Sequence, residues 1–405
     1  MKKLEVLAPV GDWERLITAV HFGADAVYFA GKKFGLRAFA ANFDEEEIKK
    51  VVEYCHNHNV KAYVTVNILA HNADFDGLLD YLKYLDSVKV DGVIVSDLGI
   101  AHLVKEYTNL ELHVSTQANV TNKESAKMWV KIGAKRLVLA RELSIQEIKE
   151  IKEAVGDDID IECFCHGAMC ISYSGRCLLS NYFVGRDSNK GACAQPCRWN
   201  YALMSKYEQS DVEGYYPIQE DERGTYILNS KDMCLVNYLD KLVDAGVTSF
   251  KIEGRMKSPY YVATTVNCYK RALNNLLNNK RADFDYVKEL EKSSHRLFTT
   301  GFYFNDTNKE NLLDSTPVQS MEFTGTVIED GDGEYIKVQM RNKFRIDDEL
   351  EVLSPSSNFL KKFKVSEILD EDNNLIEECY KPMQIVKIKC NLKLNKGDIL
   401  RKESL

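Results

Sequence analysis

The sequence predicts an α/β protein: a (β/α)8 TIM-like barrel with a Cys-rich insertion after strand 7, plus a small C-terminal antiparallel β-barrel domain. Two observations predict this architecture. Short apolar runs alternate with amphipathic stretches eight times before residue 280. Beyond residue 304, short alternating strands separated by turn sequences replace that pattern.

The eight apolar runs are rich in Val, Ile, Leu and Tyr, as strands buried on both faces of a parallel sheet should be. They span residues 4–10, 25–31, 61–68, 91–97, 110–116, 136–141, 158–165 and 249–254. Helical periodicity follows at residues 12–22, 44–58, 74–87, 98–107, 122–132, 144–154, 234–245 and 258–279. Several of these helices start at Asp, Asn or Ser, whose side-chain oxygen can accept a hydrogen bond from a free backbone N–H group. An open doubly wound sheet is the alternative, but no G-x-G-x-x-G motif follows the first strand.

These patterns divide the chain into domains. The barrel is predicted over residues 1–304, with the Cys-rich insertion at 166–225. Residues 305–317 are polar and are predicted to form a linker, and residues 318–405 are predicted to form the small β-barrel. Because the loop after a barrel strand lies at the C-terminal face, where barrel enzymes have their active sites, we expect the insertion at the functional face.

Composition and charge exclude several classes of protein. The chain has 405 residues and a net charge of −8, which excludes a generally basic nucleic-acid coat. A polyanionic partner therefore needs a local basic patch, and the candidates are Lys190, Arg198, Lys251, Arg255 and Lys257. No apolar run approaches the ~20 residues needed to span a bilayer. No signal-peptide core follows Met1, so we expect a cytoplasmic protein with no membrane partner.

Six of the eleven cysteines lie between residues 163 and 197. In a reducing compartment such a group indicates a metal or cluster site rather than disulfides. Cys170, Cys177, Cys193 and Cys197 have the spacing C-x6-C-x15-C-x3-C, and four thiolates can hold one [4Fe–4S] cluster or one Zn²⁺ ion. The spacing does not choose between these, and buried free thiols are the alternative to both.

Polar side chains also gather at the ends of the predicted strands. Charged groups inside a barrel are costly unless they are paired. Taken together, the charged residues at the strand ends therefore indicate a site for a polar, anionic ligand. For any single one of these residues, a structural ion pair is the alternative. Arg141 and Arg255 can grip a carboxylate or phosphate with two parallel hydrogen bonds. His166 could act as a general acid or base, or could be a structural histidine that caps the Cys-rich insertion.

Three familiar catalytic motifs are absent from the sequence. There is no H-E-x-x-H, no G-x-S-x-G and no G-x-x-x-x-G-K-[ST] segment. A zinc protease, a serine esterase and a P-loop NTPase therefore have no support from the sequence.

Several segments resemble the collagenase-like peptidase family of unassigned catalytic type, family U32. They include LAPVGD at residues 7–12, GADAVY at 23–28, STQAN at 115–119, HGAMC at 166–170, SGRC at 174–177 and KIEGR at 251–255. The segments GACAQPCRW at 191–199 and YILNSKD at 226–232 are most similar to the branch that hydroxylates the wobble uridine of tRNA. The resemblance runs through the whole barrel and into the C-terminal domain.

The resemblance implies a [4Fe–4S] cluster on Cys170, Cys177, Cys193 and Cys197, with Cys234 in reserve for the fourth position because some relatives use a later cysteine. It also implies that tRNA is the partner and that 5-hydroxyuridine is formed, with prephenate rather than dioxygen as the hydroxyl source. Prephenate carries two carboxylates, which suit the arginines at the barrel mouth.

The expected site residues follow from the strand ends and from this resemblance. The catalytic candidates are Glu162, His166, Glu253 and Arg255. The substrate-binding candidates are Ser115, Gln117, Asn119, Arg141 and Lys251. Three alternatives stay open: a hydroxylase of ribosomal RNA or of a small aromatic ubiquinone precursor, a collagenase-like peptidase, and a non-catalytic RNA-binding protein with a structural zinc.

Overall fold

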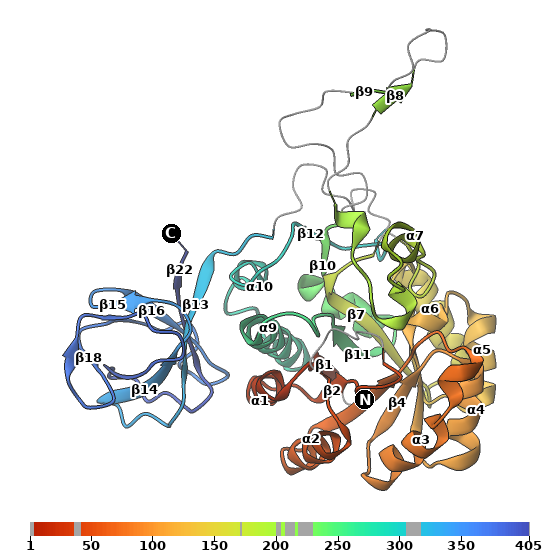
Figure 1. Cartoon of the computed structure of the whole chain (residues 1–405), viewed down its shortest axis with the longest axis horizontal. Coiled ribbons are helices and arrows are strands. Elements are labelled where there is room, and N and C mark those ends of the chain that lie inside the picture. Colours follow the sequence, from red (N-terminus) through yellow and green to blue (C-terminus); the bar gives the residue numbers. More distant parts are fainter. Residues whose placement is uncertain are drawn as a thin grey trace.

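The computed structural model describes residues 4–35, 42–170, 172–199, 204–206, 215–217, 230–304 and 317–404. Eight parallel strands form the predicted barrel (Figure 1). They are β1 (Glu5–Pro9), β2 (Ala26–Phe29), β3 (Lys61–Val66), β4 (Gly92–Val95), β5 (Glu111–Val114), β6 (Arg136–Val138), β7 (Asp160–Ala168) and β11 (Val247–Ile252). Each strand pairs with the next, and β11 pairs with both β7 and β1, which closes the barrel.

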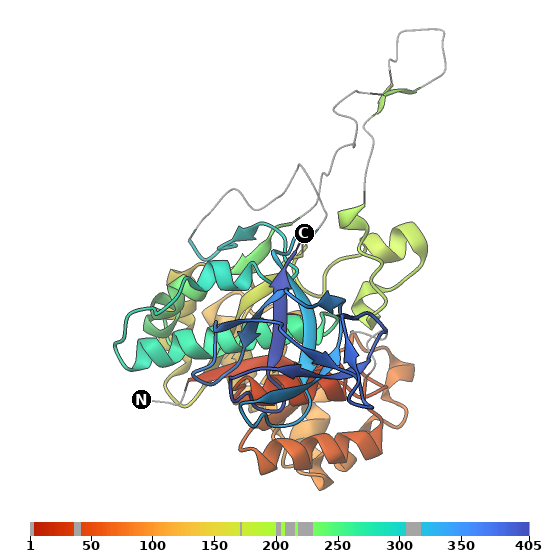
Figure 2. The ribbon, with the colours of Figure 1, turned by 90° about the vertical axis from the view of Figure 1, so that its left-hand side faces the viewer.

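Helices cover the outside of the barrel, as Figures 1 and 2 show. They are α1 (Trp13–His21), α2 (Glu45–Asn57), α3 (Leu78–Ser87), α4 (Leu98–Tyr107), α5 (Lys123–Ile132), α6 (Ile145–Val155), α8 (Leu239–Asp244), α9 (Pro259–Leu277) and the short α10 (Tyr286–Leu290). The predicted start signals act as expected, because Asp12, Asp44, Asp97, Asn122, Ser144 and Ser258 each accept a backbone N–H bond as the N-cap.

One predicted helix is wrong at its start. Residues 232–234 form strand β10 (Asp232–Cys234), and the helix begins only at Leu239, after a short 3-10 turn. Strand β10 pairs antiparallel with the end of β7, so that Cys234 lies opposite His166. Because β7 is longer than predicted, its last residues need a partner for their backbone groups, and β10 supplies it.

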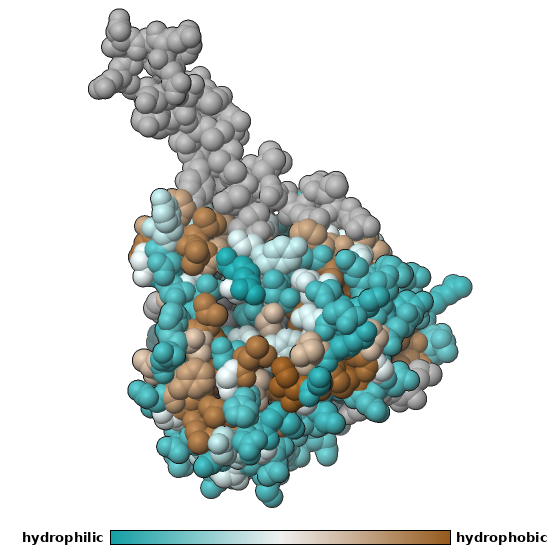
Figure 3. Space-filling model, turned by 90° about the vertical axis from the view of Figure 1, so that its right-hand side faces the viewer, coloured by the Kyte–Doolittle hydropathy of each residue, from teal (hydrophilic) through white to brown (hydrophobic). Residues whose placement is uncertain are grey.

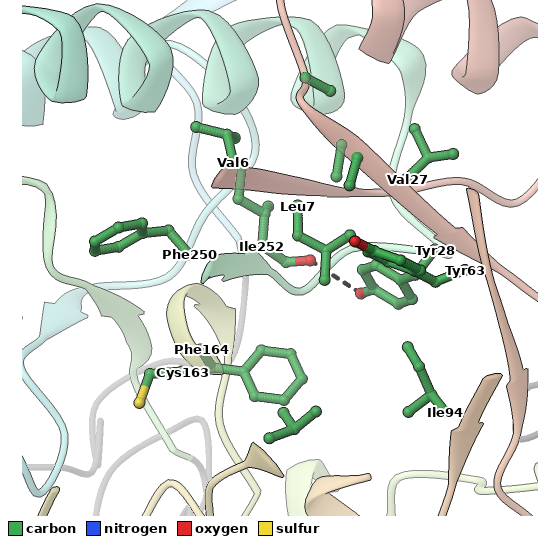
Figure 4. Close-up of a cluster of buried hydrophobic side chains, with 14 of the residues drawn as sticks. Val6, Leu7, Val27, Tyr28, Tyr63, Ile94, Cys163, Phe164, Phe250 and Ile252 are labelled. Atoms are coloured by element: carbon green, nitrogen blue, oxygen red, sulfur yellow. Dashed lines mark hydrogen bonds between the residues drawn. The ribbon is translucent and has the colours of Figure 1, made fainter. Parts of the chain in front are cut away.

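The barrel core is apolar, and a hydrogen bond connects the strands where the barrel closes. Figure 4 shows Val6, Leu7, Phe250 and Ile252 among the buried side chains of this region. The Tyr28 hydroxyl donates to the Ile252 carbonyl at 2.9 Å, the dashed line in Figure 4. This bond ties β2 to β11 across the intervening strand β1.

The C-terminal domain is an antiparallel sheet around its own hydrophobic core. Its strands run in the order β17 (Lys362–Lys364), β16 (Glu349–Leu353), β22 (Ile399–Glu403), β13 (Met321–Val327), β14 (Tyr335–Met340), β21 (Ile385–Lys389), β18 (Ile368–Leu369) and β19 (Leu375–Ile376). A second pair joins β15 (Phe344–Arg345) to β20 (Glu378–Cys379). Of the predicted linker, only residue 317 lies within the described part of the chain.

A buried ion cluster joins this domain to the barrel. Arg401 of β22 lies 2.8 Å from Glu289 of α10 and 2.6 Å from Glu351 of β16, and it has no exposed surface. Lys292 reaches the same two carboxylates at 3.0 and 2.7 Å. The two acids and two bases neutralise one another inside the interface, so the domain is held by charges that must stay paired.

We expect the substitution Arg401→Met to lower the free energy of unfolding by about 3 kcal/mol, because it leaves two buried carboxylates with one cation. Urea unfolding followed by circular dichroism measures this. The control Lys362→Met removes an exposed pair with Glu349 in the same domain and should cost less than about 1 kcal/mol. Equal losses in the two variants would show that the interface cluster contributes no more than a surface pair.

Candidate functional site

The C-terminal ends of the barrel strands surround a small polar cavity of about 50 Å³, here called the mouth pocket. Its lining residues are Tyr28, Thr65, Asn67, Ile94, Ser115, Thr116, Gln117, Phe164, Lys251, Glu253 and Arg255. A second cavity of about 110 Å³ shares Asn67 and Gln117 with it. The structure therefore brings together five of the predicted site residues: Ser115, Gln117, Lys251, Glu253 and Arg255.

Amide and hydroxyl groups line one side of the mouth pocket. Asn67 donates through Nδ2 to Ser115 Oγ at 3.2 Å and to Gln117 Oε1 at 3.1 Å. Ser115 begins a short 3-10 turn after β5, and Asn119 ends it in the left-handed region without lining the pocket. A Cβ on Gly175 would lie 2.9 Å from the Gln117 carbonyl oxygen, so glycine there lets the Cys-rich insertion approach the mouth closely.

Glu162 lies deeper in the barrel than predicted. It is the third residue of β7 and is fully buried, with Lys251 Nζ at 2.7 Å and Arg136 Nη1 at 3.2 Å. Arg136 also contacts Glu5 at 2.6 Å and the partly exposed Asp160 at 3.4 Å, so two buried acids and two bases form a floor cluster with Asp160 at its edge. Although burial opposes its charge, Lys251 and Arg136 hold the pKa of Glu162 below its ordinary value. The expectation that Glu162 lies at the mouth is therefore wrong.

Lys251 connects the floor cluster to the mouth pocket. Its ammonium group bonds Glu162 and lies 4.4 Å from the centre of the Tyr28 ring, while its side chain lines the pocket. Tyr28 Oη in turn lies 3.4 Å from Glu253 Oε2. Arg255 is buried and donates to the Asn42 side chain. The mouth thus places a carboxylate, an ammonium group and a guanidinium group around one small cavity.

His166 does not face the mouth pocket. Its ring lies among Tyr261, Tyr269 and Phe298, with centroid distances of 5.9, 5.5 and 5.5 Å. Burial lowers the pKa of His166 to about 3, so the ring is neutral near pH 7. The pairing of β7 with β11 shifts register between Lys251 and Ile252, which changes the side to which later residues of β7 point. The placement of His166 therefore fits a structural histidine rather than a general acid or base.

Arg141 joins the barrel wall to the insertion. It is buried and donates to the Ala168 carbonyl at 3.0 Å and to Ser174 Oγ at 2.9 Å. Within the described part of the chain, no carboxylate lies at ion-pair distance from it. Burial opposes its charge, but nearby Cys170 and Glu253 raise the pKa of Arg141. The positive charge of Arg141 therefore lies beside the start of the insertion. Arg141 does not line the mouth pocket.

The described part of the insertion, residues 170 and 172–199, is here called the Cys loop. It contains α7 (Leu179–Val184) and two 3-10 turns. The Leu69 N–H group donates to the Asn189 carbonyl at 3.2 Å, and Lys190 lies 2.9 Å from Asp74, so the loop is fastened to the segment after β3. Gly175, Arg176 and Asn189 line the second cavity. The Cys loop therefore covers one side of the mouth.

The four predicted ligands lie in one neighbourhood of this loop. Cys170 is exposed, and Cys177, Cys193 and Cys197 are partly exposed. Burial raises the pKa of Cys197, the positive charge of Arg198 opposes this rise, and the thiols of Cys170, Cys193 and Cys177 add to it. Among the described residues, however, no group of three or more Cys, His, Asp or Glu side chains is close enough to hold a metal ion. The donor types suit iron or zinc, but the thiols are not gathered to ligating distance.

Cys234, the reserve ligand, lies elsewhere. It is 8% exposed in β10, opposite His166, and burial raises its pKa to about 11. Its thiol lies near that of Cys165, and both are close to the Tyr269 hydroxyl. Cys234 therefore belongs with the buried Cys165 thiol, and the expectation that Cys234 is the reserve cluster ligand is corrected.

Arg198 and Arg296 lie near Cys197, and Lys257 lies near both arginines. Arg198 donates to the Met169 carbonyl at 3.3 Å. Burial, together with the positive charge of Arg198, lowers the pKa of Lys257 and of Arg296. Sequence reasoning missed Arg296, which follows no motif. It also missed Tyr28 as a site residue, although Tyr28 ends the family-like segment at residues 23–28 and is the third residue of β2.

A larger cavity of about 560 Å³ lies in the C-terminal domain. Its charged lining residues pair with one another, as in Lys362 with Glu349 and Lys402 with Asp348. The barrel mouth is therefore the better candidate, because it combines polar groups from several strand ends with the Cys loop.

Comparison with known proteins confirms the resemblance seen in the motifs. Residues 11–313 match the model of peptidase family U32, and residues 319–401 match that of the peptidase family U32 C-terminal domain. A tRNA hydroxylation protein of Bacillus subtilis is 40% identical over 99% of this chain and 95% of its own length. Four more relatives with the tRNA hydroxylation name are 34–35% identical.

Other relatives have different names. A collagenase of Porphyromonas gingivalis is 33% identical over 74% of this chain and 72% of its own length. A 23S rRNA 5-hydroxycytidine synthase of Escherichia coli is 35% identical over 83% of this chain and 49% of its own length. In the described part of the chain, every helix is too short or too polar to cross a bilayer.

We expect Glu162→Gln to destabilise the protein by about 3 kcal/mol near pH 7, because it unbalances the floor cluster. The pKa of Glu162 lies below 4.5 in the folded state, so its ion pairs stabilise the protein above pH 4.5 and are lost as the pH falls through the folded-state pKa. Unfolding at pH 7 and at pH 3 to 4 measures the difference from wild type, which should shrink in acid. A difference that stays constant with pH, or one no larger than that of the exposed control Glu349→Gln, would contradict the ion-pair account.

Proposed function

Because the chain belongs to peptidase family U32, we propose that it is an RNA-modifying enzyme that hydroxylates the wobble uridine of tRNA to 5-hydroxyuridine. The observation that carries the proposal is the mouth pocket, where groups from several strand ends meet beneath a loop with four cysteines. The names of the relatives supply the reaction class and the RNA substrate.

The side chains that line the mouth pocket suit the polar edge of a small ring and the carboxylate of an anionic co-substrate. The Asn67, Ser115 and Gln117 side chains can exchange hydrogen bonds with the polar edge of a pyrimidine. Lys251 and Arg255 supply the positive charge that a carboxylate requires. We propose prephenate as this co-substrate. If its hydroxyl moves to uracil C5 and the C5 hydrogen moves to the prephenate carbon, uracil is oxidised by two electrons and prephenate is reduced by two.

We further propose that Cys170, Cys177, Cys193 and Cys197 hold a [4Fe–4S] cluster. The neighbourhood of three thiols around Cys197 supports this, as do the adjacent cations, which offset the negative charge of four thiolates. Closing the thiols around a metal requires the loop to tighten, and metal binding commonly supplies that ordering free energy. When bound, the cluster supplies iron that can exchange electrons or polarise a hydroxyl group.

A peptidase is the second candidate, because one relative is named collagenase. Among the described residues, the Ser115 hydroxyl contacts the amides of Asn67 and Gln117, and neither amide can take a proton from it. The neutral His166 ring lies outside the mouth pocket. The described mouth therefore offers no serine–histidine pair for peptide hydrolysis.

We expect tRNA from cells lacking this gene to contain less 5-hydroxyuridine and fewer of its derivatives. Wild-type protein should restore the modification, whereas Arg255→Gln should not, because it removes the charge that holds the co-substrate. Nucleoside mass spectrometry of separated tRNA and rRNA measures this, with Lys337→Gln, at a partly exposed position of the C-terminal domain, as control. A loss confined to rRNA would favour the ribosomal alternative. Unchanged nucleosides in both RNA fractions would reject RNA hydroxylation, provided that the cells have no second enzyme of this activity.

We expect anaerobically purified protein to contain about four iron atoms per chain. Cys177→Ser and Cys193→Ser should each lose most of this iron, whereas the buried controls Cys234→Ser and Cys390→Ser should keep it. Iron and sulfide assays with absorbance near ~400 nm measure the effect. Zinc in place of iron, or equal iron in all four variants, would contradict the assignment.

A further inference from the structure

The Cys loop carries an exposed group of aromatic side chains. Tyr182, Phe183 and Trp199 are 85%, 50% and 40% exposed. The ring centroids of Tyr182 and Phe183 lie 5.7 Å apart, and those of Phe183 and Trp199 lie 6.3 Å apart. Figure 3 shows an apolar patch at its upper left, where Figures 1 and 2 place α7. Rings of this size are normally buried, so their joint exposure indicates a binding surface.

The charge around these rings is positive in an otherwise acidic chain. Between residues 170 and 199 the sequence has four Lys or Arg residues and one Asp, whereas the chain as a whole has a net charge of −8. Arg198, next to Trp199, bonds the Gln195 side chain and the Met169 carbonyl, and it has no carboxylate partner among the described residues. Lys257 lies near Arg198 and extends the positive region toward the barrel, whereas the charge of Arg296 is paired with Asp232 at 3.7 Å.

The combination of exposed aromatic rings and cations fits one class of partner. Unpaired nucleotides present flat bases, which stack on aromatic side chains, and phosphates, which bind Arg and Lys. A zwitterionic membrane or an apolar protein surface would use the rings but would gain nothing from this local excess of positive charge. The complementary charge therefore favours single-stranded nucleic acid.

The position of the rings connects them to the mouth. The same Cys loop lines the second cavity with Gly175, Arg176 and Asn189, and Lys190 fastens it to Asp74. A nucleotide strand that stacks on α7 and Trp199 would therefore lie beside the entrance through which a base must pass.

We propose that Tyr182, Phe183 and Trp199 form an aromatic platform that stacks the unpaired bases flanking the target base of an RNA loop. The inference rests on the proposed function, since it assigns the RNA-binding surface of that same site. It assigns the phosphates of the loop to Arg198 and Lys257. Fully paired RNA, whose bases are already stacked, gains nothing from the platform.

The test is fluorescence anisotropy with a fluorescein-labelled RNA hairpin that has a seven-nucleotide loop, compared with a fully paired duplex of the same length. Tyr182→Ala and Phe183→Ala should each weaken hairpin binding roughly tenfold and leave duplex binding unchanged. Tyr182→Phe, which keeps the ring, should retain the affinity. The matched control Tyr107→Ala removes a ring that is 50% exposed at the end of α4, away from the mouth, and should have no effect.

A second readout separates stacking from a general apolar contact. In hydroxylation assays, Tyr182→Ala should raise KM for the hairpin with little change in kcat. If Tyr182→Leu binds the hairpin with full affinity, the rings do not act by stacking and the platform is overturned. The platform is also overturned, in favour of a protein contact, if light scattering shows a dimer that Tyr182→Ala dissociates. If the variants bind the hairpin as wild type does and product still forms, the platform is wrong and the proposed function stands. If wild-type protein neither binds nor modifies the hairpin, both are rejected.

Discussion

The floor cluster inside the barrel is the constraint on which the rest of the site depends. Glu162 lies between Lys251 and Arg136, and Arg136 also pairs with Glu5, so two buried acids and two buried bases join four neighbouring strands. Buried charges of this kind are costly unless each one is paired. The pairing also fixes the ammonium group of Lys251 just below the mouth pocket, so the same residue neutralises the floor and supplies positive charge to the site.

Above this floor, the fold supports a site made from loops. The turn that begins at Ser115 lies across the mouth, and Gly175 lets the Cys loop contact it closely. The loop adds thiols, further cations and exposed rings to the groups at the strand ends. Rigid strands thus set the position of the pocket, while the insertion supplies the groups for metal, phosphate and base binding.

The strands, the helix caps and the second domain could be predicted from the sequence, because buried parallel strands and N-caps follow local patterns. Ser115, Gln117, Lys251, Glu253 and Arg255 were found because strand ends converge in a barrel. Glu162 and His166 were misplaced for two physical reasons: β7 continues past its apolar run, and a register shift changes the side to which its later residues point. The pairing of Arg401 with Glu289 joins residues more than 100 positions apart, and no local pattern encodes it.

The central claim is that an RNA base reaches the C-terminal mouth of the barrel beside the Cys loop. Photo-cross-linking tests it most directly: a hairpin with 4-thiouridine at the target position is irradiated with the purified protein, and the linked peptides are mapped by mass spectrometry. The account expects cross-links in the segments around residues 115–119, 172–199 and 251–257. Cross-links confined to the C-terminal domain, or to the opposite end of the barrel near Tyr107, would contradict it.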